Sequence, residues 1–172
     1  GKTCLLLGYG AIGKKLVGML QSFGMNVSVL KRSASSEENI TVYTTQQLLE
    51  ALANADAIIC SLPETPETLN LLDKTAFAAM KPNSILVNVG RGKVIDQHAL
   101  YDALKNNHLL AAGIDVWWSY PENEAARANT FPSDAPLHEL PNIIMSPHRA
   151  NQTLGEEQVR LEDIAQTVQA IA

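Results

Sequence analysis

Gly8-Tyr9-Gly10-Ala11-Ile12-Gly13 has the spacing G-x-G-x-x-G and stands between a short apolar run at residues 3–7 and a stretch of helical periodicity at 12–23. In that context the first glycine permits a tight turn, the second lets the backbone approach a pyrophosphate, and the third allows close helix–strand packing. The free N–H groups at the start of the helix face the anion. These six residues therefore predict a dinucleotide-binding loop at the first strand-to-helix turn of an α/β domain.

Strand-like and helix-like segments alternate along the rest of the chain. Apolar runs typical of buried strands occur at 3–7, 26–30, 40–43, 56–60, 84–88, 109–114 and 142–145. Helical patterns occur at 12–23, 45–53, 73–80 and 96–106, with Thr45, Asp73 and Asp96 as expected N-caps, and again at 151–171. The alternation predicts an α/β fold, a Rossmann-type doubly wound parallel sheet with right-handed helical crossovers. The irregular stretch at 120–140 is long enough to suggest a functional loop.

Composition limits the classes of partner. The chain has 172 residues, 46% of them apolar, which suits one hydrophobic core. Its formal charge of -5 comes without a cluster of basic residues, and its apolar runs are strand-sized, so neither nucleic acid nor a membrane is expected as a partner, and no metal is expected. Cys4 and Cys60 lie in apolar runs and predict buried, reduced thiols, which together with the lack of a secretory signal favours the cytoplasm.

The end of the second predicted strand indicates which dinucleotide is preferred. A site specific for NAD(H) usually has Asp or Glu there, about 20 residues after the glycine loop, to bind the adenosine ribose. This chain has Lys31-Arg32-Ser33 instead. Two cations and a hydroxyl suit a 2′-phosphate. We therefore expect NADP(H) to be preferred over NAD(H), with an ordinary solvated basic turn as the alternative interpretation.

More specific motifs follow the later strands, in an order that runs through almost the whole chain. They are Ser61-Leu62-Pro63 with Thr65 and Thr68, Asn88-Val89-Gly90-Arg91-Gly92, Gly113-Ile114-Asp115-Val116, Leu140-Pro141-Asn142 and Ser146-Pro147-His148. Together they resemble the D-isomer-specific 2-hydroxyacid dehydrogenases, a family that includes phosphoglycerate, glyoxylate and hydroxypyruvate reductases. Each motif follows the carboxyl end of a predicted strand, where open α/β sheets bind their ligands.

The resemblance implies a role for each matching residue. Arg91 corresponds to the arginine that binds the carboxylate and keto oxygen of the substrate, and His148 to the residue that shuttles a proton to and from the substrate oxygen. Asp115 corresponds to the residue that holds the nicotinamide carboxamide. The remaining residues expected around the cofactor are Leu62, Pro63, Thr68, Val89 and Gly90, with Arg91 and His148 beside it. The resemblance also implies a small 2-keto or 2-hydroxy acid as substrate and a homodimer.

One position departs from the family pattern. An acidic residue normally follows the sixth strand and pairs with the histidine, but Tyr120 occupies its place in Asp115-Val116-Trp117-Trp118-Ser119-Tyr120-Pro121. A carboxylate raises the pKa of a neighbouring histidine, so its loss makes the proton-loaded imidazolium scarcer at neutral pH. Three explanations are open: Tyr120 orients His148 as a neutral hydrogen-bond partner, Glu122 or Glu124 reaches in from the loop, or the dyad is lost. Trp117 and Trp118 could fill a substrate or interface pocket, or serve packing.

The chain begins almost at once with a strand-like run, which predicts an excised piece. We expect residues 1–172 to form the dinucleotide-binding domain of a two-domain enzyme, with 151–172 as the connecting helix and the substrate domain built from flanking segments. The leading hypothesis is hydride transfer between NADP(H) and a small D-2-hydroxy acid or 2-keto acid. The alternative is a nucleotide-sensing binding module of the same fold without turnover. The β-hydroxyacid dehydrogenases share the opening fingerprint but do not account for the motifs around Arg91 and His148.

Overall fold

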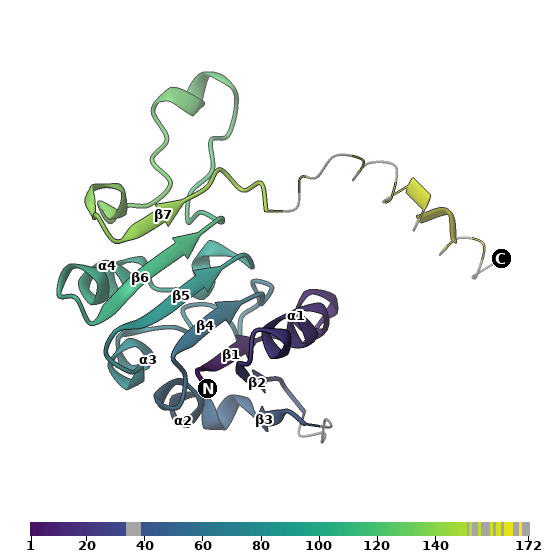
Figure 1. Cartoon of the computed structure of the whole chain (residues 1–172). Coiled ribbons are helices and arrows are strands. Elements are labelled where there is room, and N and C mark those ends of the chain that lie inside the picture. Colours follow the sequence, from purple (N-terminus) through teal and green to yellow (C-terminus); the bar gives the residue numbers. More distant parts are fainter. Residues whose placement is uncertain are drawn as a thin grey trace.

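The computed structural model describes residues 1–33 and 39–150 and, beyond them, residues 152, 155, 159, 161, 162, 164–166 and 169. Within these residues seven strands form one parallel sheet in the order β3-β2-β1-β4-β5-β6-β7 (Figure 1). The strands are β1 (Thr3–Leu7), β2 (Asn26–Leu30), β3 (Thr41–Tyr43), β4 (Ala57–Cys60), β5 (Ser84–Asn88), β6 (Leu109–Ile114) and β7 (Ile143–Met145). The predicted Rossmann-type sheet is confirmed.

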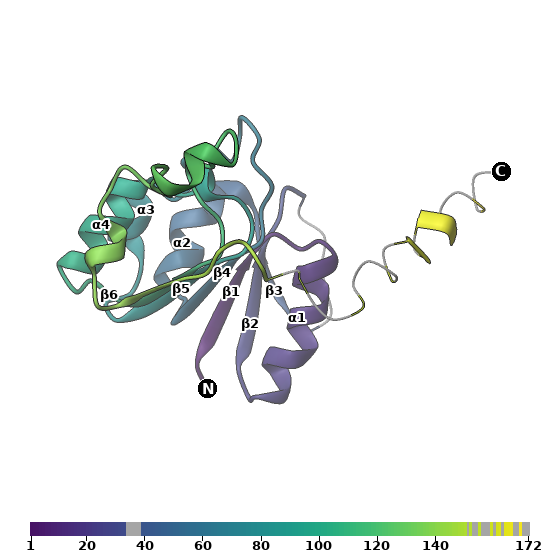
Figure 2. The same ribbon diagram turned by 90° about the horizontal axis from the view of Figure 1, so that it is seen from above.

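Helices cover the two faces of the sheet unequally. In the described part they are α1 (Ala11–Ser22), α2 (Leu48–Ala53), α3 (Lys74–Ala79) and α4 (Gln97–Lys105), with 3₁₀ turns η1 (Thr45–Gln47), η2 (Gly92–Val94), η3 (Ala125–Ala128) and η4 (Leu137–Glu139). Figure 2 shows α1 on one side of the sheet and α2, α3 and α4 on the other. The strands run outward from β1 to β3 in one direction and from β4 to β7 in the other, which places a crevice between the carboxyl ends of β1 and β4.

Two hydrophobic cores result, one on each face of the sheet. Leu5 and Leu7 of β1 belong to the larger core under α2, α3 and α4, whereas Cys4 and Leu6 belong to the smaller core under α1. Because alternate residues of a strand face opposite sides of the sheet, a run of consecutive apolar residues contributes side chains to the core on each side. Burial raises the pKa of the Cys4 and Cys60 thiols to about 11, so both remain protonated and unreactive at neutral pH.

The smaller core ends before the sheet does. Leu6, Ile59, Val87, Gly113 and Ile144 are register partners across five strands and therefore lie in one row on the α1 face. Leu6 at the α1 end is 1% exposed, whereas Ile144 on β7 is 77% exposed. Ile85 and Leu110, next to a register shift between β5 and β6, are also exposed. The half of this face over β5, β6 and β7 is thus an open apolar surface in the described part of the chain.

The helix boundaries follow local capping chemistry. The Asp73 carboxylate accepts a hydrogen bond from the N–H of Ala76, and Asp96 caps α4 in the same way, as predicted. The expected N-cap at Thr45 is wrong by one residue: Thr44 caps a 3₁₀ turn, with the Gln47 side chain accepting its N–H, and α2 starts only after that turn.

The segments at the end of the chain differ from the sequence expectation in two ways. The stretch 120–140 is not wholly irregular, because it carries the 3₁₀ turns η3 and η4. The helix expected at 151–171 lies largely outside the described residues. In the described part of the chain, no helix has the length and apolar character needed to cross a bilayer.

Candidate active site at the carboxyl edge of the sheet

The glycine loop after β1 has the geometry of an anion cradle. Gly8 has a φ of 101°, a conformation that side chains disfavour, and its N–H donates to the Leu30 carbonyl oxygen at 3.1 Å. A Cβ on Gly13 would overlap the Gly8 carbonyl oxygen, whereas the space beside Gly10 is open. No acidic residue stands in the first turn of α1, and its N-cap, Gly10, has no side chain to satisfy the free N–H groups. These features fit a pyrophosphate at the helix N-terminus.

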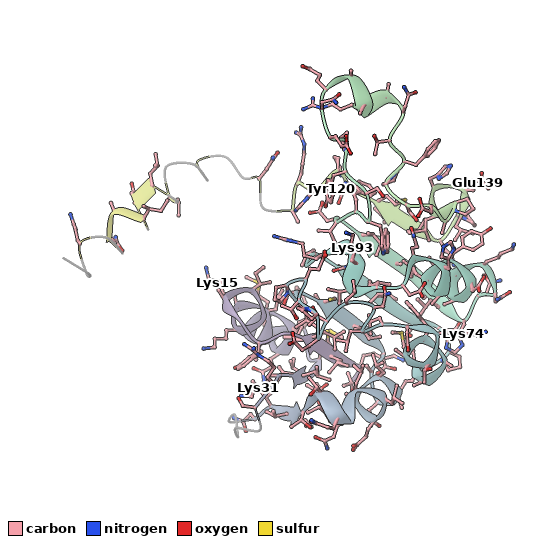
Figure 3. The ribbon with its side chains drawn as sticks, turned by 180° about the vertical axis from the view of Figure 1, so that it is seen from behind. Lys15, Lys31, Lys74, Lys93, Tyr120 and Glu139 are labelled. Carbon is pink, nitrogen blue, oxygen red and sulfur yellow. The ribbon has the colours of Figure 1, made fainter. Side chains whose placement is uncertain are left out.

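Cations gather beside this loop. The Tyr9 ring lies 5.3 Å from the Lys31 ammonium and 5.8 Å from that of Lys14, a residue that the motifs did not single out. Arg32 and Ser33 are exposed at the same turn. Arg32 faces Glu67: a hydrogen bond from the Thr65 side chain, with a smaller contribution from the Arg32 charge, lowers the pKa of Glu67. Figure 3 shows Lys31 close to α1, well away from Tyr120.

The loop after β4 is braced by its threonines. The Thr68 hydroxyl donates to the Pro63 carbonyl oxygen at 2.7 Å and accepts a hydrogen bond from the Thr65 N–H at 2.8 Å. The Leu62 backbone lies so close to Gly90 that a Cβ there would overlap it. Leu62 and Pro63 are therefore held over the end of β5, facing the crevice beside the glycine loop.

Arg91 is held between two tightly packed glycines. The buried Asn88 side chain accepts a hydrogen bond from the Gly90 N–H and donates one to the Arg91 carbonyl oxygen, both at 3.0 Å. A Cβ on Gly92 would overlap the Trp117 carbonyl group. Arg91 Nη1 donates to the Gly90 carbonyl oxygen at 2.7 Å, so within the described residues four of the five guanidinium N–H groups stay free for a ligand.

Asp115 anchors the segment that carries His148. Its Oδ1 accepts hydrogen bonds from the Ser146 hydroxyl at 2.5 Å and the Arg149 N–H at 2.9 Å, and its Oδ2 accepts one from the Ala150 N–H at 2.9 Å. Burial alone would raise the pKa of Asp115, but these hydrogen bonds, helped by the nearby His148, hold it below its ordinary value. The sequence motifs gave no sign of this anchoring.

Tyr120 lies against His148. The Tyr120 hydroxyl is 2.9 Å from His148 Nδ1 and accepts a hydrogen bond from the Trp117 N–H at 3.0 Å. Neither Glu122 nor Glu124 contacts His148 among the described residues. The geometry is that of the first of the three explanations, with tyrosine as the neutral hydrogen-bond partner. Figure 3 places Tyr120 at the foot of the long loop after β6.

The two tryptophans lie in different environments. Trp118 is 8% exposed and donates its indole N–H to the Ile95 carbonyl oxygen at 2.6 Å, so it is a core residue. Trp117 lines a cavity of about 700 Å³ together with Tyr120 and His148. His108 lies outside this site and contacts the Met80 carbonyl oxygen at 3.1 Å, which is a structural contact.

Comparisons with known proteins agree on one family. Residues 1–150 match the family model described as D-isomer specific 2-hydroxyacid dehydrogenase, NAD binding domain. The chain is 34% identical over 172 residues to D-3-phosphoglycerate dehydrogenase of Mycobacterium leprae, covering 98% of this chain and 30% of that protein. It is 33% identical over 170 residues to glyoxylate reductase of Thermococcus gammatolerans, covering 98% of this chain and 48% of that protein.

A solved structure gives the same result. The D-isomer specific 2-hydroxyacid dehydrogenase from Xanthobacter autotrophicus Py2, in complex with NADPH and MES, superposes with a TM-score of 0.75 at 28% identity. The match covers 86% of this chain and 44% of that one, so the chain spans less than half the length of each of these three proteins. The chain therefore belongs to the D-isomer specific 2-hydroxyacid dehydrogenase family, in which it matches the NAD-binding domain.

Proposed function

We propose that this chain is the dinucleotide-binding domain of an oxidoreductase that transfers a hydride between NADP(H) and a small D-2-hydroxy acid or 2-keto acid. The observation that carries the proposal is the contact between Tyr120 and His148, which fixes an imidazole at the same edge of the sheet as the glycine loop and Arg91. A site for ketone reduction needs a bound dinucleotide, a cation for the substrate carboxylate and a proton donor, and this edge offers all three.

Each residue then has a defined role. The free N–H groups of Arg91 bind the substrate carboxylate and keto oxygen. His148 donates a proton from Nε2 to that oxygen during reduction and removes it during oxidation. The bound dinucleotide supplies or accepts the hydride. Asp115 holds the backbone on the carboxyl side of His148, and its remaining acceptor position suits the carboxamide N–H of the nicotinamide.

The Tyr120 hydroxyl suits both protonation states of His148. The Trp117 N–H occupies one lone pair of the phenol oxygen. When Nε2 has given its proton to the substrate, the neutral imidazole keeps its Nδ1–H directed at the phenol oxygen, so Nε2 can take a proton back during oxidation. When the imidazolium forms, its Nδ1–H donates to the second lone pair of the phenol oxygen. The phenol therefore orients the ring without favouring the charged form, as a carboxylate would.

The test of this function is the consumption of NADPH, followed by its absorbance, with glyoxylate and hydroxypyruvate as substrates. We expect reduction of both in the enzyme, and tight cofactor binding but slow turnover in the isolated chain, where half of the water-excluding cleft is absent. NADPH binding without any reduction of small 2-keto acids by the enzyme would replace this proposal with the nucleotide-sensing module.

The exchange of Tyr120 for Glu should extend reduction to higher pH. A carboxylate within hydrogen-bonding distance of the imidazole favours the imidazolium and raises its pKa by about one unit or more. The rate of reduction should thus decline at a higher pH in Tyr120→Glu than in the parent enzyme, and Tyr120→Phe should match or fall below the parent. Identical pH–rate profiles for the parent and Tyr120→Glu would mean that another acid already partners His148.

We further propose that NADP(H) is preferred over NAD(H). Lys31, Arg32 and Ser33 follow β2 with two cations and a hydroxyl, and the ammonium groups of Lys31 and Lys14 lie over the Tyr9 ring beside the glycine loop. A 2′-phosphate offers charge-assisted hydrogen bonds to this turn that a ribose hydroxyl cannot match. The relative from Xanthobacter autotrophicus was solved with NADPH, which supports the same choice.

Arg32→Ala should therefore remove most of the difference between the two cofactors. A hydrogen bond to a charged group contributes about 1.5–3 kcal/mol, which sets the expected loss in NADPH affinity, while NADH affinity should change little. Isothermal titration calorimetry measures both dissociation constants. Lys74→Ala, which removes a cation from the start of α3, is the matched control and should leave both unchanged. Equal affinity of the unmodified protein for NADPH and NADH would contradict the preference.

The remaining expectations concern the setting of the domain. We propose that residues 1–172 act beside a substrate domain, that 151–172 connect to it, and that the enzyme is a cytoplasmic homodimer. The open apolar surface over β5, β6 and β7 supports a further packing partner, since Ile85, Leu110 and Ile144 are exposed there. The free thiols of Cys4 and Cys60 support a reducing compartment.

A further inference from the structure

The cavity of about 700 Å³ beside His148 is unused by the roles proposed above. It is lined by His148 and by Tyr120 with other residues of the long loop after β6. His148 lines this cavity, whereas Arg91, the arginine that we assign to the substrate carboxylate, does not. A substrate whose keto oxygen meets the imidazole can therefore extend its carbon chain into this space.

Two arginines line the same cavity from different elements. Arg127 comes from η3, and Arg149 directly follows His148, with its backbone N–H fixed on the Asp115 carboxylate at 2.9 Å. Neither guanidinium makes an ion pair or a hydrogen bond with any described residue, although Glu122 and Glu124 lie in the same loop as Arg127. Both guanidinium groups are charged at all relevant pH values and are without an anion there.

The rest of the lining suits a short carbon chain with a polar end. The Trp117 indole offers an apolar wall next to Tyr120. Thr130 also lines the cavity, and its hydroxyl donates a hydrogen bond to the Ala126 carbonyl oxygen at 2.8 Å. An apolar wall flanked by two forked cations is the chemistry that recognises a carboxylate or phosphate on a short aliphatic tail.

We propose that Arg127 and Arg149 bind a second anionic group, at the far end of the substrate, so that the enzyme selects 2-keto acids with a carboxylate or phosphate tail over those with a neutral one. This inference rests on the proposed function for the position of the substrate. It assigns the selection to the dinucleotide-binding domain itself, through the loop after β6 and the residue after His148.

The experiment measures equilibrium binding of matched 2-keto acids to the enzyme loaded with NADP⁺, which cannot reduce them. The carboxylate pair is 2-oxoglutarate and 2-oxopentanoate, which share a five-carbon chain, and the phosphate pair is 3-phosphohydroxypyruvate and hydroxypyruvate. In at least one pair the acid with the anionic tail should bind about 10- to 100-fold more tightly, the factor expected for charge-assisted hydrogen bonds. The pair that shows the difference identifies the tail.

The variants separate this site from the general electrostatic field. Arg127→Gln with Arg149→Gln should bring the ratio of dissociation constants close to one. Lys93→Gln, which removes a cation that does not line the cavity, should leave the ratio unchanged. Equal binding within both pairs, or a ratio that survives the double substitution, overturns the proposal.

The outcomes also distinguish this inference from the proposed function. If the enzyme selects acids with an anionic tail through the two arginines but never oxidises NADPH, the anion site is supported and the proposed hydride transfer is contradicted. If the enzyme reduces glyoxylate but shows no preference for acids with an anionic tail, the proposed hydride transfer is supported and the anion site is contradicted. Failure of all four acids to bind would remove both.

Discussion

The substitution His148→Asn is expected to lower the rate of 2-keto acid reduction by about 10²- to 10⁴-fold, the usual contribution of a positioned general acid. The affinity for NADPH should stay nearly the same, because in the proposed mechanism the imidazole meets the substrate oxygen rather than the dinucleotide phosphates. Asparagine is the right replacement for a structural reason. His148 has a φ of 55°, and the other described non-glycine residues with positive φ are all asparagines, which tolerate this conformation.

The measurement is kcat for hydroxypyruvate reduction alongside the dissociation constant of NADPH. His138→Asn is the control, because His138 is exposed in η4 and lies outside the site, and it should behave as the parent. A loss of rate accompanied by an equal loss of NADPH affinity would show that His148 holds the cofactor or the fold, and would remove the proton-donor role.

The substitution Asp115→Ala should cost about 2–4 kcal/mol of the free energy of unfolding. The buried carboxylate accepts hydrogen bonds from Ser146, Arg149 and Ala150, and its removal leaves these donors unsatisfied or dependent on water. It should also lower kcat, because the segment carrying His148 loses its anchor. Urea unfolding measures the first effect, and Asp102→Ala, at an exposed position on α4, is the control and should change stability by less than about 0.5 kcal/mol.

The same carboxylate predicts a pH dependence of stability. Because the pKa of Asp115 is lower in the folded protein than its ordinary value, ionised Asp115 stabilises the fold above that ordinary value, near pH 4. The contribution is lost as the pH falls through the folded pKa. The stability difference between the parent and Asp115→Asn should therefore be constant near neutral pH and shrink below about pH 4. A difference that stays constant into the acid range would contradict the anchoring.

The sequence predicts the fold through patterns that act locally. The glycine spacing, the two-sided apolar strands and the N-caps Asp73 and Asp96 all depend on neighbouring residues, and the structure confirms them. The sequence left three explanations open for the partner of His148. Tyr120 is 28 residues from the histidine along the chain and the loop acids are at a similar separation, so only the path of the loop decides which of them meets the imidazole.

Contacts between separate loops could not be predicted from sequence patterns. The Asp115 oxygens accept hydrogen bonds from backbone N–H groups more than 30 residues away, and a backbone N–H carries no signature in the sequence. The sequence did not indicate a binding role for Arg127 either, because an arginine in a polar loop is typical of an ordinary protein surface. The exact start of the α2 region was missed because Thr44 and Thr45 are equally good caps, and the Gln47 side chain decides between them.

The wedged glycines on either side of Arg91 have a consequence for how such an enzyme can diversify. Gly90 is pressed against the Leu62 backbone and Gly92 against the Trp117 carbonyl group, so the arginine can shift only if two neighbouring loops shift with it. The side chains at 117 and 127 face open space and carry no such restriction. We therefore expect new substrate ranges to evolve by exchanging side chains along the loop after β6, with the Gly90-Arg91-Gly92 frame unchanged as each new specificity arises around it.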